Sequence, residues 1–160
     1  MKVKTILVPL DGSILAENAL TSAVDLAREH GARLVLLRAA EAHSLPMADP
    51  TEAQVEAVRA AEAYLADARG RVAQAGVAEI ETSVWYGPPV EAIVEAARFR
   101  GADLIVMSSH GRSGLGRLVL GSVAESVQRA TRVPILLIRP GEAPIDTPFM
   151  PVTAKEIANV

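Results

Sequence analysis

One polar, glycine-rich segment is better suited to chemistry than the rest of the chain. It begins as Ser108-Ser109-His110-Gly111, and nine residues separate Gly111 from Gly121-Ser122. The residues before it are mostly apolar and those after it have helical periodicity, so the segment joins a buried strand to a helix. Backbone amides, a hydroxyl group and a helix N-terminus then meet at one place, which is an arrangement that binds phosphate.

A second candidate segment, Pro9-Leu10-Asp11-Gly12-Ser13, follows the first apolar run of the chain. The carboxylate of Asp11 can accept hydrogen bonds from ribose hydroxyls or from an adenine amino group. The same residues also form a good turn, in which the Ser13 hydroxyl would cap the next helix. Residue type alone leaves both interpretations open.

The second half of the glycine-rich segment also has a purely structural interpretation. The sequence Ser122-Val123-Ala124-Glu125 has the spacing of a capping box, which satisfies the first amides of a helix without any ligand. A capped helix N-terminus can still face an anion, so the two interpretations are compatible.

Apolar runs of strand length alternate with longer stretches of helical period along the chain. The expected strands are 5–10, 33–38, 80–85, 103–107 and 133–138, and the expected helices are 15–30, about 51–75, 89–99 and 122–130. Strands joined by helices form a parallel sheet covered on both faces, so the fold class is α/β with a doubly wound five-stranded sheet. Ligands bind beyond the carboxyl ends of such strands, where Asp11 and Ser108 are expected. Residues 39–50 and those from 141 onward should be loop-like.

Composition limits the remaining possibilities. The chain has 160 residues, half of them hydrophobic, which fits one domain over residues 1–140 and a tail over 141–160. A net charge of -3 gives no general attraction for nucleic acid or anionic membranes, so we expect neither as a partner. The absence of cysteine excludes disulfides and thiolate metal sites. The apolar stretch 3–10 is too short for a signal peptide, and we expect a cytoplasmic protein.

Several common sites are excluded by missing residues. The chain has neither a P-loop lysine motif nor a Gly-x-Gly-x-x-Gly after the first strand. Ser13, His110 and Asp11 lack the nucleophile elbow of a hydrolase triad. A receiver-type phosphoacceptor site would need clustered acids and a lysine that the strand ends do not supply. Three scattered histidines predict no metal site, and we identify no catalytic residue.

The glycine-rich segment resembles the nucleotide loop of the universal stress protein family, whose ATP-binding members have the pattern Gly-x2-Gly-x9-Gly-(Ser/Thr). Gly111, Gly121 and Ser122 match this pattern, whereas Ser108 replaces its first glycine. A small residue that can donate a hydrogen bond is expected to weaken or retune binding more than to abolish it. The resemblance extends over residues 4–139 and includes the turn 87–93 and the run 102–107.

This resemblance implies an adenine nucleotide α-hydrolase-like fold with strand order 3-2-1-4-5, and an adenine nucleotide (ATP, AMP or ADP) as ligand. Mg²⁺ would enter only as the companion of a triphosphate. It also implies a homodimer formed through residues 133–138, and ligand-dependent regulation during stress with at most slow ATP hydrolysis. The residues that would contact the nucleotide are Pro9, Asp11, Ala39, Met107, Ser108, His110, Gly111, Arg112, Gly121, Ser122 and Val123.

Two other functions remain as alternatives. A stress protein of the same fold could have lost nucleotide binding and act through its dimer surface and tail, which Ser108 would favour. A true ATPase would lose turnover, but not binding, when an acid such as Asp11 is replaced. A monomer whose last strand is covered by the tail is the alternative to the dimer.

Overall fold

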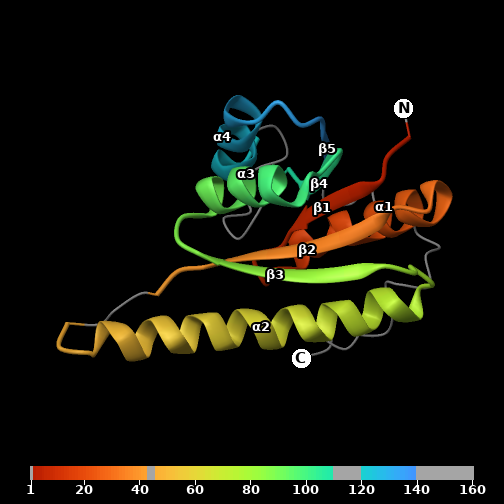
Figure 1. The fold of residues 1–160 in the computed structure, drawn as a ribbon. Coiled ribbons are helices and arrows are strands. Elements are labelled where there is room, and N and C mark those ends of the chain that lie inside the picture. Colours follow the sequence, from red (N-terminus) through yellow and green to blue (C-terminus); the bar gives the residue numbers. More distant parts are fainter. Residues whose placement is uncertain (1, 43–45, 110–119, 140–160) are drawn as a thin grey trace.

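The structure is a computed structural model that describes residues 2–42, 46–109 and 120–139. These residues form five strands and four helices in strict alternation (Figure 1). In chain order the elements are β1 (Thr5–Pro9), α1 (Ile14–His30), β2 (Arg33–Ala40), α2 (Pro50–Gln74), β3 (Ile80–Tyr86), α3 (Pro89–Arg100), β4 (Leu104–Ser108), α4 (Ser122–Ala130) and β5 (Ile135–Ile138). None of the described helices is long and apolar enough to cross a membrane.

The five strands form one parallel sheet in the order β3-β2-β1-β4-β5. This confirms the expected fold class and strand order. The order reverses between β1 and β4, and all five strands end at the same edge of the sheet. The turns that follow β1 and β4 therefore lie next to each other at the carboxyl edge.

Helices cover both faces of the sheet, as Figure 1 shows. On one face, the buried side chains of α1 and α2, such as Leu20 and Leu65, pack on Leu36 and other residues of β1 and β2. On the opposite face, α3 and α4 cover Leu37 and Ile105. The central strands are buried on both faces, which explains why they are continuous apolar runs in the sequence.

Most of the expected boundaries lie within one residue of the observed ones, and the two that differ by two residues have local causes. β5 begins at Ile135, not at Val133, because the Val133 amide donates to Thr131 Oγ1 and Pro134 has no amide hydrogen. β2 continues through Ala39 and Ala40, so the loop expected over 39–50 is shorter than predicted. The tail from 141 lies outside the described residues.

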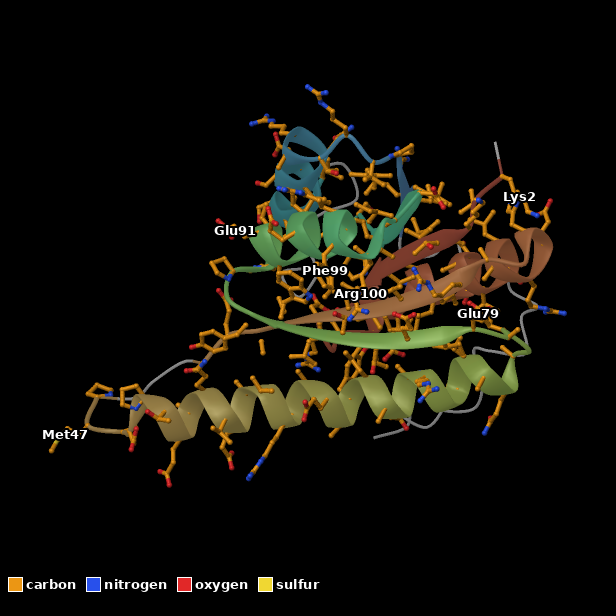
Figure 2. All side chains as sticks on the ribbon, viewed as in Figure 1. Lys2, Met47, Glu79, Glu91, Phe99 and Arg100 are labelled. Carbon is orange, nitrogen blue, oxygen red and sulfur yellow. The ribbon has the colours of Figure 1, made fainter. Side chains whose placement is uncertain are left out.

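Polar side chains join the strands near their amino ends. The carboxylate of Asp103 accepts hydrogen bonds from the backbone amides of Lys4 and Thr5, at 2.8 and 2.9 Å, just before β4 begins. Glu81 on β3 forms ion pairs with both Arg33 and Arg100, at 2.8 and 3.0 Å. Figure 2 shows Arg100 between α3 and β3. These contacts hold α3 and four strand starts together, far from the carboxyl edge.

Candidate functional site

The turn between β1 and α1 is ordered by two side chains of its own sequence. Asp11 Oδ1 accepts hydrogen bonds from the backbone amide and the hydroxyl of Ser13, at 2.8 and 2.5 Å. The Ser13 hydroxyl oxygen accepts from the Ala16 amide at 3.1 Å and so caps α1. The predicted cap is confirmed. The Asp11 carboxylate thus orders the turn and lies at the carboxyl edge, so its structural role and a ligand role are compatible.

Arg38, near the end of β2, contacts this turn, and the sequence analysis missed it. A Cβ atom added to Gly12 would lie 2.9 Å from Arg38 Nη1, so the guanidinium group packs directly against the glycine backbone. The Arg38 guanidinium also lies over the Tyr64 ring of α2, 4.7 Å from its centre. The available signal was that Arg38 directly follows four consecutive apolar residues of this strand.

A half-buried network of hydrogen bonds behind the turn connects the first turn of α1 to α2. Glu17 accepts hydrogen bonds from the Tyr64 hydroxyl at 2.8 Å and from Arg71 Nη1 and Nη2 at 2.8 and 3.0 Å. Burial acts to raise the pKa of Glu17, but the hydrogen bonds from Arg71 and Tyr64 outweigh it and hold that pKa below its ordinary value. Burial and the neighbouring Glu17 charge both raise the pKa of Tyr64. Glu17 is therefore ionised and Tyr64 neutral at pH 7.

The end of β4 connects directly to the start of α4. Ser108 and Ser109 are buried, and the Ser109 amide donates to Ile138 O at 2.8 Å. The Gly121 amide donates to Ser109 O at 2.8 Å, although eleven residues separate the two in the sequence. This hydrogen bond fixes the N-terminus of α4 beside the carboxyl end of β4.

The prediction of a capping box at the start of α4 is wrong. The N-cap residue is Gly121, which has no side chain, and no side-chain hydrogen bond caps the helix. Ser122 is the first helical residue and is exposed, so its hydroxyl is one position too late to cap the following amides. Glu125 instead forms an ion pair with Arg129 on the next turn. Among the described residues, the first amides of α4 thus have no acceptor from a capping side chain.

The other predicted residues fall into three groups. The structure brings Pro9 and Ala39 to the same edge as Asp11, both half-buried at the ends of β1 and β2. Met107 is buried and Val123 is half-buried, and both belong to the core beneath α3 and α4. The remaining three predicted residues lie outside the described part of the chain: His110, Gly111 and Arg112.

Comparison with known proteins agrees with this architecture. The family model described as "Universal stress protein family" matches residues 2–139. The chain belongs to the universal stress protein family. A curated universal stress protein from Thermus aquaticus is 38% identical over 138 residues, which cover 85% of this chain and 98% of that protein.

Solved structures of universal stress proteins share the fold. The protein UspA from Lactobacillus plantarum superimposes with a TM-score of 0.74 at 29% identity, covering 87% of this chain and 99% of that one. A universal stress protein in complex with cAMP has a TM-score of 0.69 at 28% identity, covering 86% and 98%. A family member from Archaeoglobus fulgidus in complex with dAMP has a TM-score of 0.58 at 25% identity, covering 86% and 99%.

Proposed function

We propose that this universal stress protein binds an adenine nucleotide at the carboxyl edge of its sheet and acts as a ligand-dependent regulator in the stress response. The nucleoside would lie against the β1–α1 turn near Asp11, and the phosphates would lie at the N-terminus of α4. ATP, ADP and AMP are the candidate ligands. Two family members of similar fold are complexes with cAMP and dAMP, which supports an adenine nucleotide as the ligand class.

The observation that supports this proposal most strongly is the start of α4. Its N-cap is Gly121, which lacks a capping side chain, and its backbone is joined to β4 through Ser109. The first amides of a helix point along the axis and favour an anion, here on the side of the strand ends. A bound phosphate group would accept the hydrogen bonds that a serine or aspartate N-cap would otherwise accept.

The assembly, metal and location belong to the same proposal. β5 is at one edge of the sheet, and its Leu136 is 37% exposed, which suits pairing with a second copy in a homodimer. Mg²⁺ would enter with a triphosphate, because the predicted contacts offer few oxygen ligands besides Asp11. We propose a cytoplasmic location and a regulatory role, and no catalytic residue is assigned.

A calorimetric titration of nucleotide-stripped protein with Mg-ATP, followed by AMP, tests the proposal. We expect micromolar binding. In a Gly121→Asp variant, the new carboxylate would cap α4 and repel the phosphates, and two unit charges about 4 Å apart repel by about 4 kcal/mol at an effective dielectric of 20. Screening by water and salt reduces this repulsion, so we expect affinity for ATP to fall by about tenfold or more.

Gly70→Asp is the matched control. Gly70 lies on the exposed side of α2, no atom lies within 4 Å of the position that a Cβ would occupy there, and the variant adds the same charge far from α4. It should bind ATP like the wild type. Absence of heat at two temperatures from folded wild-type protein would refute the nucleotide proposal and favour a stress protein that acts through its dimer surface and tail.

A further inference from the structure

We propose that Arg38 is a positioning residue of this site, whose guanidinium group fixes the turn that presents Asp11 and so makes nucleotide affinity depend on the packing of α2. This inference rests on the proposed nucleotide function. It concerns a residue outside the two segments that the sequence analysis identified.

The first step is the contact between Arg38 and the turn. Gly12 has a φ of 83°, a left-handed conformation that favours glycine, and the Arg38 guanidinium fills the space where a side chain would begin. Asp11 and Ser13 flank this glycine and are hydrogen-bonded to each other. A displacement of Arg38 would therefore leave the backbone between Asp11 and Ser13 without its packing partner.

The second step is the support of Arg38 from α2. Its guanidinium is stacked on the Tyr64 ring, and the Tyr64 hydroxyl donates to Glu17 in the first turn of α1. Arg71 holds the same Glu17 carboxylate with two hydrogen bonds. The contacts run from the turn through Arg38, Tyr64 and Glu17 back to the same turn, because α1 starts where Arg38 contacts it. A shift of α2 would therefore move Arg38 and the turn together.

The third step concerns the charge of Arg38. Within the described residues, no carboxylate forms an ion pair with Arg38, whereas Arg33, Arg71, Arg100 and Arg129 each have at least one such partner. The planar guanidinium contacts both the face of the Tyr64 ring and the Gly12 backbone. A lysine ammonium has no flat face to fill this space, so shape as well as charge is expected to matter.

The experiment is a double-mutant cycle read by calorimetric titration with Mg-ATP. Arg38→Met keeps much of the side-chain length and removes the planar cation. Asp11→Asn keeps an oxygen that can order the turn but removes the proposed nucleoside carboxylate. We expect Arg38→Met to weaken binding by about tenfold in the wild type and by less than about threefold in the Asp11→Asn background, since coupled residues are not additive.

Two further variants test the shape and the support. Arg38→Lys should recover only part of the lost affinity. Tyr64→Leu removes the aromatic face that supports Arg38 but keeps the arginine in the sequence, and it should also weaken binding. This variant keeps the test informative if Arg38→Met fails to fold. The matched control is Arg98→Met, which removes an exposed arginine from α3 and should leave affinity unchanged.

The outcomes separate this inference from the function on which it rests. If the wild type binds Mg-ATP and Arg38→Met binds equally well, the inference is overturned and the nucleotide proposal stands. Full recovery by Arg38→Lys also overturns the inference, because Arg38 would then act only as a positive charge. An equal loss in both Asp11 backgrounds overturns it as well, because Arg38 would then act independently of Asp11. Absence of binding by the wild type overturns both.

Discussion

Replacing Glu17 with glutamine removes the charge at the centre of the network between α1 and α2. The Glu17 carboxylate accepts three hydrogen bonds, and its side chain and that of Arg71 are 18% and 20% exposed. Glutamine keeps one acceptor oxygen but turns an NH₂ group toward donors, so at least part of this set is lost. Hydrogen bonds to charged groups contribute about 1.5–3 kcal/mol each, and partial solvent access reduces the loss. We expect the free energy of unfolding to fall by about 2 kcal/mol at pH 7.

The loss should depend on pH in a defined direction. Burial acts to raise the pKa of Glu17, but the hydrogen bonds from Arg71 and Tyr64 lower it below its ordinary value of 4.5. A carboxyl group whose pKa is lowered by folding contributes stability above its unfolded pKa and loses it as pH falls through the folded value. The difference between wild type and Glu17→Gln should therefore be full at pH 7 and shrink below about pH 4.

Urea unfolding followed by circular dichroism at several pH values measures both effects. Glu125→Gln is the matched control, because its ion pair with Arg129 also joins an acid to an arginine but is exposed on α4. It should cost less than about 0.5 kcal/mol. The reasoning would be refuted by a loss below that size for Glu17→Gln at pH 7, or by a loss of the same size at pH 7 and pH 3.

Two other substitutions test the core and the sheet edge. Leu65→Ala should lower the free energy of unfolding by about 2–5 kcal/mol in the same assay, because Leu65 is fully buried between α2 and the sheet. A loss below about 1 kcal/mol would mean that the neighbouring side chains fill the cavity. Leu136→Glu places a charge on the exposed face of β5 and should convert the proposed homodimer to a monomer, as measured by light scattering after gel filtration. An unchanged mass would exclude β5 from the interface.

The strands and helices were predictable because their signals are local, whereas the strand order was implied by the family resemblance. The apolar runs that became β1, β2 and β4 are buried, and helix ends are marked by residues with fixed conformational preferences. Gly31 ends α1 in the left-handed conformation, and Pro89 starts α3 where a missing amide hydrogen has no cost. Each of these features depends on a few neighbouring residues, so the sequence alone contains it.

The candidate site was predictable only in part. The turn at Asp11 and the cap at Ser13 follow from short-range hydrogen bonds. The N-terminus of α4 was not predicted correctly, because the helix begins one residue earlier in the chain than a serine N-cap requires. Gly121 is therefore the N-cap residue, and it has no capping hydroxyl. Arg38 was missed because Gly12 and Tyr64 come from other elements, and only the folded sheet brings them together.

The polar contacts near the amino ends of the strands have a consequence for how this architecture can diverge. Asp103 and the group of Glu81, Arg33 and Arg100 stabilise the end of the sheet that the proposed ligand does not touch. A change at the opposite edge, such as serine at the end of β4 where the family pattern has glycine (position 108), does not involve these contacts. A chain of this architecture can therefore change or lose its ligand without losing its fold. The amino and carboxyl edges of the sheet can then evolve under separate selection.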